Sequence, residues 1–290
     1  MKKVVVVGNG FVASHLPYEK SSIKFDPRWD QISDFLWREK PDVVVNCIGF
    51  CGAPNIDACQ IEKTRTYTAN VTMPLLFAQA CKNRNIRFIH VGSGCINYGK
   101  SPNNKCTIIE EKFHCDNCEL CKSDSGWRET DYSSPQSYYS KTKYAADLVL
   151  GELENTTILR IRMPISGMKS PRNLLTKLIG YKRVVEAPNS VTFMDDFVNA
   201  IDFVIQKEKI GIYNVVSPIP LTHSILLNEY KLHVPSHTYE SIGTEELSSL
   251  VAAPRSNCIL DSSKIVNEGF VFTDTYTQMR ATIKKFVENQ

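Results

Sequence analysis

The chain predicts an α/β protein, a doubly wound parallel sheet joined to a smaller C-terminal lobe. Its first half alternates short Val- and Ile-rich runs with amphipathic segments of helix length, and this alternation is typical of parallel sheets with helices on both faces. A glycine-rich turn directly follows the first apolar run. Beyond Arg162 the alternation loosens, because five prolines divide the chain into shorter elements.

The elements follow one another in a regular order. The predicted buried strands are Val4–Val7, Ile23–Phe25, Val43–Cys47, Arg87–Ser93 and Thr157–Arg162. The predicted helices between them are Phe11–Tyr18, Asp30–Arg38, Thr64–Lys82 and Ser137–Glu154. A strand–helix–strand succession favours right-handed crossovers and a parallel order of strands.

Composition excludes several classes of protein. Lys plus Arg number 34 and Asp plus Glu 31 in 290 residues, so the net charge of +3 favours neither nucleic acid nor a membrane surface as a partner. No apolar run reaches the length of about 18 residues that spans a bilayer. The run Val4–Val7 is too short for a signal peptide. With ten cysteines, far below the density of a disulfide scaffold, we expect a cytoplasmic protein with reduced thiols.

The first strand ends in a dinucleotide-binding fingerprint, the run Gly8-Asn9-Gly10-Phe11-Val12-Ala13. Gly8 permits the tight turn, Gly10 lets the backbone approach a pyrophosphate, and the small Ala13 lets the helix pack closely. The backbone N–H groups of Phe11 and Val12 then face the phosphates. This placement predicts a Rossmann-type sheet that binds a nicotinamide dinucleotide.

The residues after the expected second strand leave the choice of dinucleotide open. Asp26 could accept a hydrogen bond from a ribose 2′-hydroxyl, which favours NAD. Lys24 and Arg28 flank it and could hold a 2′-phosphate, which favours NADP.

Tyr139 and Lys143 form a Tyr-x-x-x-Lys pair on a predicted helix. Positions i and i+4 lie on one helix face, so the Lys143 ammonium group can lower the pKa of the Tyr139 phenol toward the range in which it can act as an acid or base at neutral pH. Ser93, at the end of the strand Arg87–Ser93, can supply a second hydroxyl. This pattern is that of the short-chain dehydrogenase/reductase family, in which the serine and tyrosine hold a substrate carbonyl oxygen.

Longer motifs make the resemblance narrower. They are Gly49–Asp57, Tyr139–Lys143, Leu159–Ser166, Pro171–Lys177, Gly211–Val215 and Ala253–Leu260. Through them the chain resembles the plant-type bifunctional UDP-4-keto-6-deoxyglucose 3,5-epimerase/4-reductases of UDP-rhamnose synthesis, and it is similar to dTDP-4-dehydrorhamnose reductase. The resemblance implies NADPH as cofactor, UDP-β-L-rhamnose as product and a homodimer formed through the helices Thr64–Lys82 and Ser137–Glu154.

The resemblance also implies roles for individual residues. Cys95, two positions after Ser93, and Lys177 are the expected proton-transfer groups of epimerisation, beside the reductive groups Tyr139 and Lys143. The other positions that match the family are expected to bind ligands. Asn173 and Arg255 are expected at the diphosphate of the sugar nucleotide, and Asn46 and Gly49 along the cofactor.

We expect residues 1–162 to form the NADP-binding Rossmann domain and residues 163–290 mainly a substrate-binding lobe, with segments returning to the sheet. Inside the first part, a cysteine cluster has the spacing of a possible zinc site. Its members are Cys106, Cys115, Cys118 and Cys121. We interpret it as a loop of reduced thiols and assign no metal. His15, His90, His223, His233 and His237 lack a metal-binding context and are expected to be structural.

Two other functions compete with the bifunctional enzyme. One is 4-reduction alone, on a dTDP- or UDP-4-keto-L-rhamnose that another protein has already epimerised. The other is a non-catalytic, nucleotide-binding regulatory subunit related to these reductases. The presence of Ser93, Tyr139 and Lys143 together argues against the second.

Overall fold

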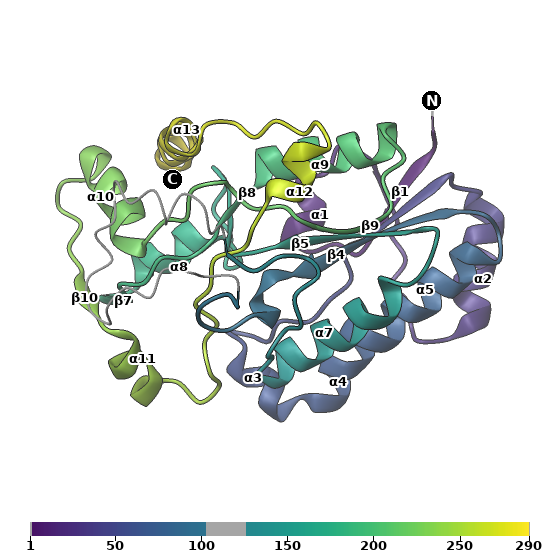
Figure 1. Ribbon diagram of the computed structural model, residues 1–290, viewed down its shortest axis with the longest axis horizontal. Helices are drawn as coiled ribbons and strands as arrows, with labels where there is room; N and C mark the ends of the chain where they lie inside the picture. Colours follow the sequence, from purple (N-terminus) through teal and green to yellow (C-terminus); the bar gives the residue numbers. More distant parts are fainter. Residues whose placement is uncertain (1, 103–125, 290) are drawn as a thin grey trace. The chain divides into compact units, whose positions relative to one another are not determined.

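The computed structural model describes residues 2–102 and 126–289 (Figure 1). It contains two compact units. The first consists of Met1–Ile96, Pro135–Arg160 and Phe197–Tyr213, and the second of Asn97–Ser134, Ile161–Asp196 and Asn214–Gln290. Each unit is therefore assembled from three separate stretches of the chain.

A six-stranded sheet organises the first unit. Its strands are β1 (Val4–Val7), β2 (Glu19–Lys20), β3 (Val43–Asn46), β4 (Arg87–Ser93), β5 (Thr156–Ile161) and β9 (Gly211–Asn214), in the order β2-β1-β3-β4-β5-β9. Strands β2, β1, β3 and β4 pair in parallel, with Val5 beside Val44 and Val45 beside Ile89. β-Branched side chains fill these central strands because both faces of the sheet are covered. The predicted parallel α/β class is confirmed.

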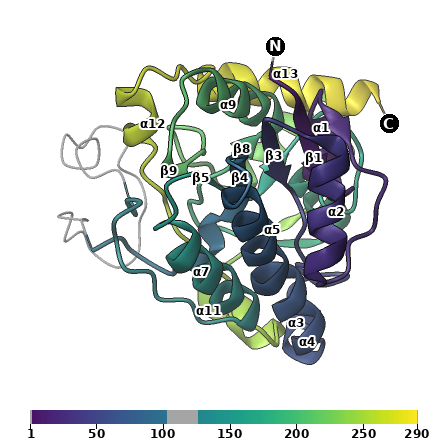
Figure 2. The ribbon, with the colours of Figure 1, turned by 90° about the vertical axis from the view of Figure 1, so that its right-hand side faces the viewer.

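Helices cover the two faces of this sheet (Figures 1 and 2). On one face lie α2 (Trp29–Glu39), α5 (Met73–Lys82) and α7 (Tyr138–Leu150), and on the other α1 (Phe11–His15) and α9 (Met194–Gln206), most of which belongs to this unit. The shorter α3 (Asp57–Ile61) and α4 (Lys63–Tyr67) lie beside α7. Phe35, Phe77 and Phe88 anchor the core between α2, α5 and the sheet.

The predicted strand Ile23–Phe25 is wrong. The second strand is β2, and the backbone leaves it at Ser21, whose N–H donates to Val6 O. The apolar side chains that suggested a strand pack against the core from an irregular segment instead: the Phe25 ring meets the rings of Phe35 and Phe77 at 4.9 Å between centroids. Short apolar runs do not distinguish these two uses.

Two predicted helices also differ from the structure. Helix α1 ends at His15 because Leu16 is already extended, as the residue before a proline must be. The predicted helix Thr64–Lys82 contains a π-helical turn, η1 (Thr68–Thr72), between α4 and α5. Such insertions are frequent at functional sites.

The second unit has its own core. Helices α8 (Leu174–Gly180), α10 (His223–His233) and α13 (Thr275–Glu288) surround it, with two parallel two-stranded sheets, β6 (Pro164–Ile165) with β8 (Thr192–Phe193) and β7 (Arg183–Val185) with β10 (Glu240–Ile242). Two short helices, α11 (Thr244–Leu250) and α12 (Ser263–Asn267), also belong to this unit. Leu175, Phe193, Leu226 and Phe286 are among its buried side chains. Among the described residues, no helix is both long and apolar enough to cross a membrane.

Candidate active site

The glycine turn lies at the point where the order of the strands reverses. Strand β1 stands between β2 and β3, and in sheets of this kind ligands bind beyond the carboxyl ends of the strands at such a point. Gly8 has φ +99°, and a Cβ there would lie 2.9 Å from the backbone of Cys47 after β3. A Cβ on Gly10 would meet no heavy atom within 4 Å. The backbone after β3 therefore leaves no room for a side chain at position 8, whereas the space beside Gly10 is free of protein atoms, as a pyrophosphate site requires.

Two asparagines fix the loop after β3. Asn46 Oδ1 accepts from Ile48 N at 3.0 Å. Asn70, on the π-helical turn η1, accepts from Phe50 N at 2.8 Å and donates to Phe50 O at 2.9 Å and to Thr142 Oγ1 at 3.1 Å. The loop that contains Gly49 is thereby tied to α7. The sequence gives no signal for Asn70, because it does not reveal the π-turn that directs this side chain inward.

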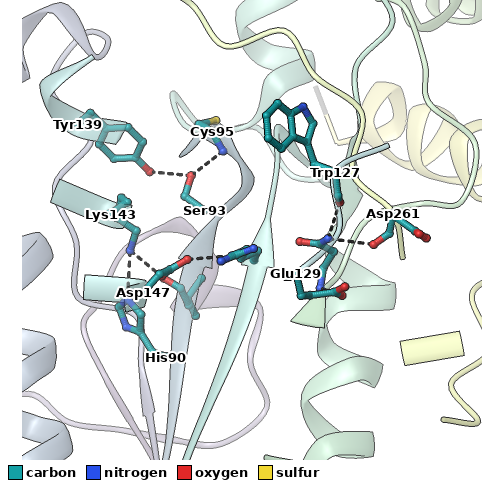
Figure 3. A network of polar contacts seen from close by, with 12 residues as sticks. His90, Ser93, Cys95, Trp127, Glu129, Tyr139, Lys143, Asp147 and Asp261 are labelled. Carbon is teal, nitrogen blue, oxygen red and sulfur yellow. Dashed lines mark hydrogen bonds and ion pairs between the residues drawn. The ribbon is translucent and has the colours of Figure 1, made fainter. Parts of the chain in front are cut away.

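The three residues predicted from the reductase pattern come together at the end of β4 (Figure 3). Tyr139 Oη donates to Ser93 Oγ at 3.3 Å, and Cys95 N donates to the same oxygen at 3.2 Å. Ser140 Oγ holds the other side of the turn by donating to Cys95 O at 2.7 Å. Ser137 starts α7 by accepting from Ser140 N, so the helix cap and the site share one segment. The thiol of Cys95 is half-buried beside this pair.

Tyr139 keeps its proton in this arrangement. Burial raises its pKa well above the usual 10, and the nearby thiol of Cys95 acts in the same direction. The hydrogen bond with Ser93 opposes this shift. The pKa of Tyr139 is thus raised, not lowered as the Tyr-x-x-x-Lys pattern predicted, and at neutral pH the phenol is a proton donor.

Lys143 lies below Tyr139 on the same face of α7, with its amine directed toward β4 (Figure 3). Its Nζ donates to Val91 O at 2.9 Å and lies 3.3 Å from His90 Nε2. One turn further on, Asp147 accepts from Arg160 Nε at 2.9 Å, and both side chains are buried. Burial lowers the pKa of Lys143, whereas the charge of Asp147 raises it.

The residues considered for the choice of dinucleotide are exposed. Arg28 and Asp26 form an ion pair of 3.7 Å between side chains that are both more than half accessible. Because β2 ends at Lys20, these residues lie in the irregular segment after the strand and at the start of α2, not at a strand end.

Three predicted residues belong to the second unit. Asn173 is fully buried and caps α8, and its amide group binds Leu175 N, Ser166 O and Met168 O. Lys177 is half-buried in the last turn of α8. Arg255 donates to Ala253 O at 2.8 Å. The amide of Asn173 is thus occupied in shaping the loop that leads to Lys177.

The cysteine cluster of residues 106, 115, 118 and 121 lies outside the described residues. The six described cysteines form no disulfide with one another. Within residues 2–102 and 126–289, no group of three or more His, Cys, Asp or Glu side chains is placed to hold a metal ion.

A parallel sheet with a dinucleotide turn and a Ser–Tyr–Lys arrangement defines a reductase of the short-chain type. The family model for the RmlD substrate binding domain matches residues 19–197, and the chain belongs to this family.

Individual relatives agree with this assignment. The chain is 32% identical over 259 residues to a bifunctional dTDP-4-dehydrorhamnose 3,5-epimerase/dTDP-4-dehydrorhamnose reductase of Arabidopsis thaliana, covering 88% of this chain and 80% of the relative. It is also 32% identical to the trifunctional UDP-glucose 4,6-dehydratase/UDP-4-keto-6-deoxy-D-glucose 3,5-epimerase/UDP-4-keto-L-rhamnose-reductase RHM3 of the same plant, of whose length it spans 36%.

Among solved structures, the L780 UDP-rhamnose synthase of Acanthamoeba polyphaga mimivirus superposes with a TM-score of 0.85 at 25% identity, over 98% of this chain and 99% of the other. The dTDP-4-dehydrorhamnose reductase of Bacillus anthracis, solved in complex with NADP, shares the fold with a TM-score of 0.77 at 17% identity over the full length of both chains.

Proposed function

We propose that this protein is a bifunctional 3,5-epimerase/4-reductase that converts UDP-4-keto-6-deoxy-D-glucose to UDP-β-L-rhamnose with NADPH. The names of its relatives support both activities and the nucleotide-sugar substrate. The observation that carries the proposal is the hydrogen bond from Tyr139 to Ser93, with Cys95 bound to the same oxygen through its backbone.

Reduction requires a proton donor beside the C4 oxygen. NADPH, when bound, supplies the hydride that reaches C4. Ser93 and Tyr139 hold the C4 oxygen, and Tyr139, whose pKa burial raises, gives it a proton. Lys143 binds the cofactor and adjusts the acidity of Tyr139 from the next turn of α7.

Epimerisation requires groups that remove and return protons at C3 and C5. The C4 ketone acidifies both carbons, because the carbanion is delocalised into an enolate. We assign these transfers to Cys95 and Lys177, while Ser93 and Tyr139 stabilise the enolate oxygen.

The remaining predicted residues contribute to binding. The open turn at Gly10 supports a pyrophosphate site formed by Gly8, Asn9, Gly10, Phe11 and Val12. Gly49 lies in the loop that Asn46 and Asn70 hold, and we place this loop along the cofactor. We propose Arg28 at the 2′-phosphate, Arg255 at the diphosphate of the substrate, and Asn173 as support for the helix of Lys177.

The two compact units support a division into an NADP-binding part, 1–162, and a mainly substrate-binding part, 163–290, with returns to the sheet. We also propose a homodimer through α7 and the α4–α5 stretch. Leu148 and Val149 on α7 and Tyr67 on α4 are each about half exposed, which leaves apolar surface for a second copy. Light scattering on the wild type and on Leu148→Glu tests this. We also propose a cytoplasmic location, where cysteine thiols stay reduced.

Incubation with UDP-4-keto-6-deoxyglucose and NADPH, followed by identification of the sugar, tests the main proposal. The wild type is expected to form UDP-rhamnose, and Cys95→Ala is expected to lose about 10²-fold or more of this activity while still reducing pre-epimerised 4-keto-L-rhamnose. Cys81→Ala, which removes a thiol from the core of α5, is the matched control. Normal UDP-rhamnose formation by Cys95→Ala would show that the assignment of Cys95 to epimerisation is wrong. A wild type that reduces only the pre-epimerised 4-keto-L-rhamnose would favour 4-reduction alone. If NADPH is not consumed with any 4-keto sugar nucleotide, a regulatory subunit becomes the better interpretation.

A further inference from the structure

His90 is a buried imidazole in the middle of β4 that contacts the amine of Lys143. Its side chain has no exposed surface. Nε2 lies 3.3 Å from Lys143 Nζ (Figure 3). Nδ1 lies 3.0 Å from Asn46 Nδ2. Both ring nitrogens therefore have one defined neighbour inside the protein.

The protonation of the imidazole follows from the orientation of the Asn46 amide. Asn46 Oδ1 accepts from the backbone N–H of Ile48, and a backbone N–H can only donate. This fixes the NH₂ group of Asn46 toward His90, so His90 Nδ1 must accept. A neutral imidazole carries a single N–H, and that proton must then be on Nε2, facing Lys143.

The amine of Lys143 thus faces an N–H donor. An ammonium group has three donors and no acceptor, so one of its hydrogens can satisfy Val91 O, but it cannot accept from His90. A neutral amine has a lone pair and can accept this hydrogen bond. The hydrogen-bonding pattern around His90 is complete only when Lys143 is uncharged.

We propose that His90, held by Asn46 in the Nε2–H form, is a positioning residue that fixes the Lys143 amine against β4 and favours its uncharged state before ligands bind. The inference rests on the roles proposed for Tyr139 and Lys143. An uncharged Lys143 leaves the phenol of Tyr139 protonated, which prepares the site to deliver a proton to the substrate.

Other groups around Lys143 act on its charge. Asp147 on α7 favours the ammonium form, but Arg160 on β5 already neutralises this carboxylate. The thiols of Cys51 and Cys47 after β3 act in the same direction as Asp147. Burial opposes all of them by lowering the pKa of Lys143. Burial, and after it the nearby Lys143 amine, also hold the pKa of His90 well below 6.5, so the imidazole stays neutral.

Nitrogen NMR of the intact protein tests the inference without turnover. His90 is expected to show a protonated Nε2 and an unprotonated Nδ1 that do not change across neutral pH. The Lys143 Nζ signal, assigned by its loss in Lys143→Met, is expected to titrate at higher pH in His90→Leu and at still higher pH in His90→Gln, whose amide oxygen can accept from an ammonium group. His237→Gln, on the second unit, is the matched control. A proton on Nδ1, or an unchanged Lys143 titration in both His90 variants, would overturn the inference.

The pH profile of turnover supplies a second measurement. A charged Lys143 stabilises the tyrosinate, so the alkaline limb of kcat for 4-keto reduction is expected to move down by about one pH unit in His90→Gln. A purely structural role for His90 would lower kcat at all pH values without moving the limb, and this result would contradict the inference. If the wild type does not consume NADPH at all, the proposed function fails, whereas the NMR titration still decides the role of His90.

Discussion

Helices α7 and α8 each carry a lysine assigned to chemistry, but they hold it differently. In α7 of the first unit, Lys143 is 4% exposed, and its amine is hydrogen-bonded to Val91 O and close to His90. In α8 of the second unit, Lys177 is half-buried at the end of a helix of 7 residues, compared with 13 in α7. Each helix begins with a side-chain cap, Ser137 for α7 and Asn173 for α8.

The difference separates the two proposed half-reactions. The reductive groups lie on a long helix and a central strand, where each buried polar side chain restricts its neighbour. Such a site is organised before the ligands bind, which suits a step whose proton donor must be in place when hydride arrives. Lys177 is less deeply buried than Lys143, and this suits a group that serves carbons on a sugar whose ring changes shape during epimerisation.

The largest effect is expected from Tyr139→Phe. Loss of the phenolic proton donor should lower kcat for reduction by about 10³-fold, because general acid catalysis contributes 10²–10⁴-fold. Exchange of the C3 and C5 hydrogens in D₂O, followed by NMR without NADPH turnover, should persist at a reduced rate. Tyr138→Phe is the control, since this neighbouring ring faces Lys63 instead of Ser93. Equal loss of exchange and reduction would show that the two half-reactions are not separable in this way.

The sequence was sufficient to predict that the proposed reductive residues lie close together, because each belongs to a local pattern. Tyr139 and Lys143 are related by one helical turn, and Ser93 ends a long apolar run, so strand and helix assignments were sufficient to bring them together. His90 lies in that same apolar run, and a polar residue within a buried strand is the one signal that could have identified it. Its partner Asn46 becomes evident only when β3 and β4 are paired, with Asn46 beside His90.

Other features depend on contacts that a sequence does not show. Phe25 was interpreted as part of a strand because its packing on Phe35 and Phe77 joins it to two helices, α2 nearby and α5 about 50 residues further along the chain. The inward direction of Asn70 depends on a π-helical turn that has no compositional signal. Asn173 matched a family pattern, yet its amide group is engaged in capping α8.

Arg160→Met tests how strongly the α7 site depends on its buried charges. Removing the guanidinium group leaves Asp147 as an unpaired buried carboxylate, which should cost about 3–5 kcal/mol of stability. Burial already raises the pKa of Asp147 above 3.8, and Arg160 opposes this shift. A carboxyl group whose pKa is higher in the folded than in the unfolded protein stabilises the fold at a pH below its unfolded-state pKa. This stabilisation is lost as the pH rises through the folded-state pKa. Without Arg160 the folded-state pKa of Asp147 rises further. The substitution should therefore lower the free energy of unfolding more at pH 8 than at pH 5.

Urea denaturation at the two pH values measures this effect. Arg183→Met is the control, because its ion pair with Glu246 is exposed and should contribute less than about 1 kcal/mol. An equal, small loss in both variants would mean that the carboxylate of Asp147 does not depend on Arg160.

Lys177→Met tests the lysine of α8 and with it the proposed epimerisation. Because Lys177 is assigned to one of two proton transfers, we expect exchange at one carbon, C3 or C5, to fall by about 10²-fold and exchange at the other to change little. Reduction of pre-epimerised substrate should remain within a few fold of the wild type. Lys182→Met, an exposed lysine just beyond α8, should leave both exchange rates intact. Slow exchange at both carbons would assign Lys177 to binding instead of proton transfer.

The smallest effect is expected from Arg28→Ala, at the exposed edge of the first unit. The guanidinium group is more than half accessible and pairs only loosely with Asp26 at 3.7 Å, so it is available for a 2′-phosphate at little cost to the fold. Loss of one such contact should raise KM for NADPH by about tenfold or more, because a hydrogen bond to a charged group contributes about 1.5–3 kcal/mol and about 1.4 kcal/mol corresponds to tenfold. KM for NADH should be unchanged. Arg38→Ala, at the far end of α2, should change neither value. If KM rises equally for both cofactors, Arg28 does not read the 2′-phosphate, and Lys24 becomes the residue to test, because it lies in the same irregular segment after β2.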